Sequence, residues 1–123
     1  MTDCNITKIT TDKSATIISF NVASLTASAD MDTVSRQISD LIKNQKPKNV
    51  IIDFTGVKFF SSQTLGLLID ARKKTSAYKG NIVISGINPQ LYRVFKITNL
   101  DKIFKFYHDL PSAIDDLNKT QKN

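Results

Sequence analysis

The sequence contains very few of the side chains from which disulfides, metal sites and catalytic centres are built. Among its 123 residues there is one cysteine, Cys4, and one histidine, His108. A single cysteine cannot form an internal disulfide, and these two residues do not have the spacing of a metal site. His108 lies after the last predicted strand, so we expect it at the surface rather than in a serine–histidine pair. The sequence therefore predicts no catalytic residue, no metal and no cofactor.

Long apolar runs and glycine-rich loops are missing as well. The longest apolar stretches are too short to cross a membrane, and the opening MTDCNITK lacks the apolar region of a signal peptide. The four glycines are dispersed along the chain, so no phosphate-binding loop is present. We therefore expect a cytoplasmic protein with no membrane contact. We also expect a single domain over 1–123, with a core over about 5–118 and a frayed tail over 119–123.

The chain carries an excess of positive charge, and every one of its acidic residues is an aspartate. The 17 lysines and arginines against 11 acids give a net charge of +6. In the sequence the lysines are spread over two predicted helices, a strand and the tail, without the interleaved aromatic residues typical of a nucleic-acid-binding segment. This distribution favours solvated helix faces, so the sequence predicts no nucleic-acid partner.

Hydrophobic periodicity predicts alternating strands and helices. In the first half of the sequence, the pattern predicts a hairpin of strands 6–10 and 15–20, with a turn at 12–14. A loop over 21–29 follows, and then a helix from Asp30 or Asp32 to about Lys43. The second half predicts a strand over 49–54, a helix over 62–78, a strand over 81–85, a helix from Pro89 to about 98–99, an edge strand over 102–107 and a last helix from Pro111.

This order predicts an α/β domain with a mixed, mostly parallel sheet, an N-terminal hairpin and about four helices. The helix between strands 15–20 and 49–54 makes a crossover, which favours parallel pairing of these two strands. Asn88 is expected to cap the helix that begins at Pro89, and Asn99 to adopt a left-handed conformation where this helix ends.

The stretch 49–68 organises the rest of the chain. Its first part is a β-branched and aromatic run interrupted only by Asp53, which suits a strand covered on both faces. We expect Asp53 to form hydrogen bonds with the loop that follows it. We also expect three apolar residues to pin this loop to the core, and three more to form the inner face of the helix: Val57, Phe59 and Phe60, then Leu65, Leu68 and Ile69.

Ser61 and Ser62 stand where this helix begins, and two interpretations remain open. Either hydroxyl could cap the helix by accepting a hydrogen bond from an unpaired N–H of the first turn. Alternatively, one of them could be phosphorylated, because the helix dipole and the free N–H groups suit a phosphate. Gly66 lies in the second turn at a cost of about 1 kcal/mol relative to alanine, which suggests close approach of another backbone or of a partner.

The segment from Asp53 to Gly66, DFTGVKFFSSQTLG, resembles the core of a STAS domain, the fold of the bacterial anti-sigma factor antagonists. The resemblance continues through Asn88-Pro89, Arg93-Val94-Phe95 and Tyr107. Ser62 falls on the serine that is phosphorylated in the family, with Ser61 as the alternative acceptor. Ser61 replaces the aspartate that the family often has before this serine, Gln63 and Thr64 replace a serine and a glycine, and 22–26 lacks the Gly and Asp often found there.

The resemblance implies a non-enzymatic signalling module. Such domains bind a serine kinase that is also an anti-sigma factor, are released when this kinase phosphorylates their serine, and are reset by a phosphatase. The partner-binding residues implied by the motif are Ser61, Ser62, Gln63, Thr64 and Gly66. The alternative is a STAS-type protein-binding domain with another partner and no phosphorylation, in which Ser61 and Ser62 only cap the helix.

Overall fold

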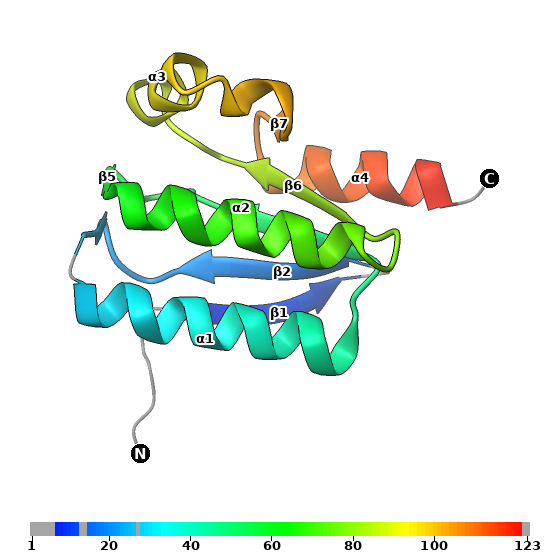
Figure 1. The fold of residues 1–123 in the computed structure, drawn as a ribbon. Helices are drawn as coiled ribbons and strands as arrows, with labels where there is room; N and C mark the ends of the chain where they lie inside the picture. The colour runs from blue at the N-terminus through cyan, green and yellow to red at the C-terminus, as the bar shows by residue number, and fades with distance from the viewer. Residues whose placement is uncertain (1–6, 13–14, 27, 122–123) are drawn as a thin grey trace.

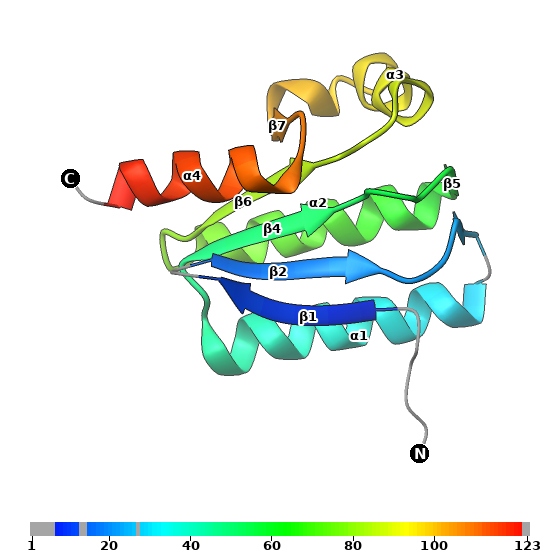
Figure 2. The same cartoon turned by 180° about the vertical axis from the view of Figure 1, so that it is seen from behind.

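The computed structural model describes residues 7–12, 15–26 and 28–121, which form a five-stranded sheet with helices on both faces (Figure 1, Figure 2). The strand order is β1-β2-β4-β6-β7. β1 pairs antiparallel with β2, and all other pairs in this sheet are parallel. The predicted α/β class, hairpin and parallel crossover are therefore confirmed. The strands are β1 (Thr7–Asp12), β2 (Ala15–Phe20), β4 (Asn49–Asp53), β6 (Asn81–Ser85) and β7 (Lys105–Tyr107).

The helices divide between the two faces of the sheet. α1 and α2 lie side by side over one face, and α4 packs against β4 and β6 on the other (Figure 2). α3 contributes Phe95 to the core on the α1–α2 side and is followed by a short 3₁₀ helix, η1. The helices are α1 (Ser28–Gln45), α2 (Ser62–Ser76), α3 (Pro89–Ile97), η1 (Leu100–Lys102) and α4 (Leu110–Gln121).

β4 occupies the centre of the sheet, between β2 and β6, and all of its residues are buried. Because side chains alternate along a strand, Val50 and Ile52 face the core under α1 and α2, whereas Ile51 faces the smaller core under α4. This two-sided burial is what the apolar run predicted.

A second, two-stranded sheet lies at one end of the molecule, where the sequence predicted only loops. β3 (Ser24–Leu25) pairs in parallel with β5 (Phe59–Phe60). The prediction that Phe59 pins its loop to the core is wrong, because its side chain is 60% exposed. Neighbouring residues of an extended segment point to opposite sides, and here Phe60 takes the inner position against the rings of Phe54 and Phe95.

The inner face of α2 also differs from the predicted one. Leu65 and Leu68 are buried as expected, but Ile69 is 36% exposed, so its assignment to the inner face is wrong. The buried stripe runs instead through Thr64, Leu68, Ala71 and Thr75, at helical spacing, with Leu65 and Leu67 on its flanks. Two of the buried residues are threonines, so a prediction that uses apolar residues alone assigns the wrong inner face to α2.

The last predicted strand is shorter than expected. η1 occupies its beginning, and only Lys105–Tyr107 pair with β6. Asn99 has the predicted left-handed conformation, with φ of 64°. Asn88 caps α3 by accepting a hydrogen bond from the amide of Leu91 at 2.9 Å, also as predicted. The predictions for residues 1–6, which include Cys4, for 13–14 and for 122–123 lie outside the described residues.

Leu68 and Ile69 offer a direct test of the α2 packing. Leu68→Ala should lower the free energy of unfolding by about 2–5 kcal/mol, because this side chain is fully buried. Ile69→Ala should change it by only roughly 0.5 kcal/mol, as at other surface positions. Urea unfolding followed by circular dichroism measures both; equal losses would mean that the assigned face is wrong.

Candidate functional site

Ser62 is the first residue of α2 and is exposed, at the end of the molecule where α1 and α2 begin (Figure 1). Ser61 occupies the N-cap position in an extended conformation, and its carbonyl accepts the hydrogen bond from the amide of Thr64 at 3.0 Å. The Ser61 hydroxyl, however, is shielded from solvent and makes no hydrogen bond to the first turn. Ser61 therefore holds the cap position through its backbone and not through its side chain.

Backbone hydrogen bonds to the β3 segment fix the approach to Ser62. The amides of Lys58 and Phe59 donate to the carbonyl of Ala23, at 2.7 and 3.1 Å, and the amide of Ser61 donates to the carbonyl of Leu25 at 3.1 Å. Together with the inward ring of Phe60, these bonds set where α2 begins. The start of the helix is thus determined by chain segments far apart in the sequence.

Asp53 forms the hydrogen bonds expected of it. Its Oδ1 atom accepts from the hydroxyl of Ser85 at 3.0 Å, from the hydroxyl of Thr55 at 2.8 Å and from the Thr55 amide at 3.4 Å. These bonds join the carboxyl ends of β4 and β6 and satisfy a side chain that is only 8% exposed. The structural role of Asp53 is confirmed by this geometry.

Two further residues hold the loop between β4 and β5. Gly86 has φ of +66°, and a Cβ atom there would lie 2.1 Å from the Thr55 hydroxyl and 2.9 Å from the Asp53 carboxylate. Asn88 donates from its side-chain amide to the carbonyl of Val57 at 3.1 Å, while also capping α3. The Asp53 hydrogen-bond cluster therefore requires a glycine at position 86.

The residues implied as partner-binding do not all face outward. Ser62, Gln63 and Gly66 are exposed, but Thr64 is only 2% exposed, and its hydroxyl donates to the carbonyl of Leu25 at 3.2 Å. Gln63 donates to the carboxylate of Asp32 at 2.9 Å, which links the beginnings of α2 and α1. Thr64 therefore anchors the helix from inside and offers no side-chain surface to a partner.

Gly66 lies in open space. Apart from the backbone of its own helix, no atom of the described chain would lie within 4 Å of a Cβ there. Of the two alternatives for Gly66, close approach of another backbone of this chain is therefore wrong, and close approach of a partner stays a prediction. Ser62, Gly66 and Ile69 follow the spacing i, i+4, i+7 and share the outer face of α2. The exposed side chain of Phe59 precedes this helix start by three residues, so polar and apolar side chains are both exposed around it. We call Phe59, Ser62, Gln63, Gly66 and Ile69 the Ser62 face.

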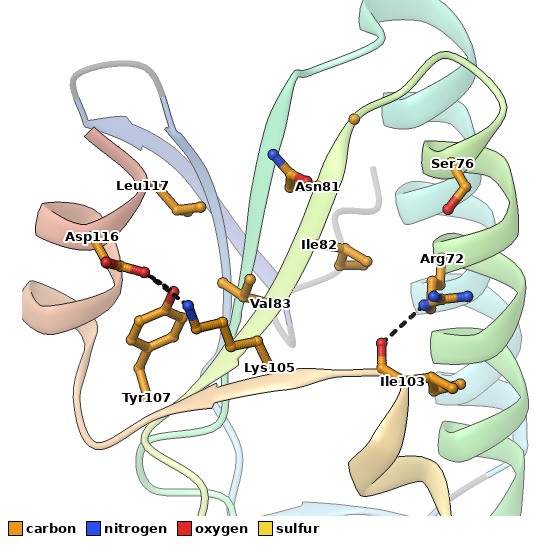
Figure 3. Close-up of a pocket in the computed structure, with 11 residues that line it drawn as sticks. Arg72, Ser76, Asn81, Ile82, Val83, Ile103, Lys105, Tyr107, Asp116 and Leu117 are labelled. Atoms are coloured by element: carbon orange, nitrogen blue, oxygen red, sulfur yellow. Dashed lines mark hydrogen bonds and ion pairs between the residues drawn. The ribbon is translucent and has the colours of Figure 1, made fainter. Parts of the chain in front are cut away.

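A separate cavity of about 330 Å³ lies between α2, β6, β7 and α4 (Figure 3). The Lys105 ammonium lies 3.1 Å from the Asp116 carboxylate, to which the Tyr107 hydroxyl also donates. On the α2 side, Nε of Arg72 donates to the carbonyl of Ile103 at 2.9 Å. These contacts tie α4 and α2 to the β7 segment.

The protonation state of Lys105 and Tyr107 does not suit a general base. The hydrogen bond to Asp116 raises the pKa of the Lys105 ammonium, and burial raises the pKa of the Tyr107 hydroxyl. Both groups therefore stay protonated at neutral pH, and neither is a general base. His108 is exposed, as expected, and no three potential metal ligands gather among the described side chains.

None of the helices in the described part of the chain has the length and apolar character to span a bilayer.

Comparisons with known proteins bear on the family and the fold of the chain. The family model described as STAS domain matches residues 8–113. An anti-sigma F factor antagonist from Paenibacillus polymyxa is 22% identical over 86 residues, which cover 70% of this chain and 74% of that protein.

Solved structures resemble the chain over most of its length. An anti-sigma-factor antagonist (STAS) domain protein from Planctomyces limnophilus has a TM-score of 0.79 at 23% identity, covering 87% of this chain and 92% of that one. The Bacillus cell fate determinant SpoIIAA in its phosphorylated form has a TM-score of 0.72 at 18% identity, covering 90% and 98%. These likenesses establish the fold.

Gly86 and Gly56 test how far the Asp53 cluster constrains the site. Both have positive φ, but the position around Gly56 is open, whereas a side chain at Gly86 meets Thr55. Gly56→Ala should cost about 1–2 kcal/mol of unfolding free energy from backbone strain alone. Gly86→Ala should cost distinctly more, and urea unfolding of the two variants measures the difference. If both variants lose the same unfolding free energy, the Asp53 hydrogen-bond cluster can move to accommodate a side chain at position 86 at no cost in stability.

Proposed function

The chain belongs to the STAS domain family, and from that premise we propose that it is a signalling module that binds a protein partner through the Ser62 face. The observation that carries the proposal is the exposure of Ser62 at the start of α2, with Gly66 and Ile69 after it on the outer face of the helix and the exposed Phe59 before it in β5. Exposed apolar side chains beside a polar helix start are typical of a protein-binding surface.

We further propose that the partner is an anti-sigma factor or a similar serine kinase, and that phosphorylation of Ser62 releases it. The names of the relatives support the first part, since they are anti-sigma factor antagonists. A phosphorylated form of one structural neighbour supports the second. A phosphatase would restore binding. In this proposal the protein acts in the cytoplasm and catalyses no reaction itself.

The physical chemistry of the α2 start favours Ser62 as the acceptor. A phosphate adds about −1.5 to −2 charges, and a helix N-terminus stabilises such a charge with its dipole and unpaired N–H groups. The domain should therefore stay folded when it is modified. A partner packed on Phe59 and Ile69 would have to desolvate the phosphate, so its binding should weaken.

Substitutions on the Ser62 face test this proposal. The partner is first captured from a lysate of the source organism and identified by mass spectrometry, and its affinity is then measured with purified proteins. Ser62→Asp should weaken binding by roughly tenfold, about 1.4 kcal/mol, whereas Ser62→Ala should leave it within about twofold. Incubation of protein and partner with ATP, followed by peptide mapping, locates any phosphate.

Phe59→Ala provides a test that does not depend on phosphorylation. It should weaken partner binding, whereas Ile97→Ala, which removes a side chain 74% exposed on α3, is the matched control and should not. Loss of binding in Phe59→Ala with no phosphate on Ser62 or Ser61 would favour the alternative, a STAS-type binding domain without a phosphorylation switch. If neither Phe59→Ala nor Ser62→Asp changes binding, the proposed surface is wrong.

A further inference from the structure

Lysines that are dispersed in the sequence gather at the end of the molecule opposite to Ser62. α1 and α2 both end there, as Figure 1 shows. The loops that follow the two helices touch, because the amide of Asn81 donates to the carbonyl of Lys48 at 2.7 Å and the hydroxyl of Tyr78 donates to the carbonyl of Pro47 at 2.8 Å. The exposed lysines of this end are Lys43, Lys46, Lys48, Lys73, Lys74 and Lys79.

A groove of about 540 Å³ lies between the last turns of α1 and α2 at this end. Ile42, Ala77 and the ring of Tyr78 give it an apolar floor. Lys43, Lys46 and Lys74 surround the floor, together with Ser39. The groove thus combines an apolar base with a cationic border.

The border is only partly neutralised by acids of the chain. Lys74 pairs with Asp70 at 2.8 Å and donates to the hydroxyl of Ser39 at 2.7 Å, which holds its side chain across the groove. Among the described residues this is the only ion pair at the border. An anionic group above the groove would therefore meet the positive charge of Lys43 and Lys46.

We propose that this groove, which we call the lysine groove, is a second docking surface that binds an acidic amphipathic segment of a partner protein. Carboxylates of such a segment would meet the lysines, and an apolar side chain between them would enter the floor. The one large aliphatic side chain of the groove, Ile42, is only 1% exposed, and Ala77 is small, so the groove offers no protruding apolar side chains like those that a membrane-binding helix inserts into a bilayer. Tyr78 is the one aromatic side chain among the residues that line the groove, whereas sites for single-stranded nucleic acid stack successive bases on several aromatic side chains.

The lysine groove is independent of the proposed switch. α2 has 15 residues, so its two ends are roughly 20 Å apart at 1.5 Å per residue. A phosphate on Ser62 therefore lies too far from the groove to neutralise its lysines at physiological salt.

The probe for the test is a fluorescein-labelled peptide of about 16 residues, rich in glutamate, with leucines at helical i, i+3, i+4 and i+7 spacing. Fluorescence anisotropy measures its affinity for the full chain. Removing three groove lysines together should weaken binding by roughly tenfold, about 1.4 kcal/mol. The groove variant is Lys43→Gln, Lys46→Gln and Lys74→Gln, and the matched control, with the same change of net charge, is Lys8→Gln, Lys58→Gln and Lys96→Gln.

Two further measurements separate the groove from diffuse charge. Ala77→Glu removes no lysine but places a carboxylate on the floor, so it should also weaken binding. A peptide with serine in place of every leucine should bind more weakly than the original. Ser62→Asp should leave the affinity for the leucine peptide unchanged. A failure of the proposed phosphorylation switch can therefore be distinguished from a failure of the proposed groove. Circular dichroism checks that every variant is folded.

Three results would overturn the proposal. The first is equal weakening by the groove variant and the control variant, which would mean that only net charge matters. The second is equal binding of the leucine and serine peptides, which would exclude a role for the apolar floor. The third is a DNA oligonucleotide of equal charge, or anionic vesicles, that bind more tightly than the leucine peptide and lose the same affinity in the groove variant. The groove would then be a surface for nucleic acid or for a membrane.

Discussion

The burial of β4 on both faces is the constraint on which the rest of the structure depends. A strand that is covered on both sides must have partners on both edges and helices above and below. β2 and β6 supply the edges, and each of these parallel neighbours is connected to β4 through a helix, α1 or α2. Both crossover helices lie on the same face, which places their beginnings at one end of the molecule and their ends at the other (Figure 1). The Ser62 face and the lysine groove are the two consequences of this arrangement.

Most of the fold could be predicted from the sequence because long elements repeat their pattern. In the apolar run of β4, and in the cap and proline of α3, several residues point to the same element. β3 and β5 have two residues each, and such short strands carry no periodicity that could reveal their pairing. The exposure of Ile69 was missed because Thr64 and Thr75 lie on the buried face of α2, where their hydroxyls bond to backbone carbonyls.

The candidate site was predictable in position but not in detail. The motif around Ser62 placed it at a helix start, and the helix does start there. Phe59 could have been recognised as outward-facing, since two adjacent phenylalanines in an extended segment cannot both point inward. The inward Thr64 depends on contacts with Leu25 and Met31, and the position of Ser61 depends on its backbone hydrogen bond to Leu25, all distant in the sequence. The gathering of lysines likewise arises only when the α1 and α2 ends are brought together.

The buried bonds of Thr64 have a consequence for the kinetics of any association at this end of the molecule. Its hydroxyl, the β3–β5 pairing and the Asp53 cluster already hold the backbone before Ser62 in one arrangement. A ligand that meets a preformed surface loses little conformational entropy of the receptor and needs no slow rearrangement to complete the complex. The association rate would then be limited by diffusion and orientation, and ligands would differ mainly in their dissociation rates.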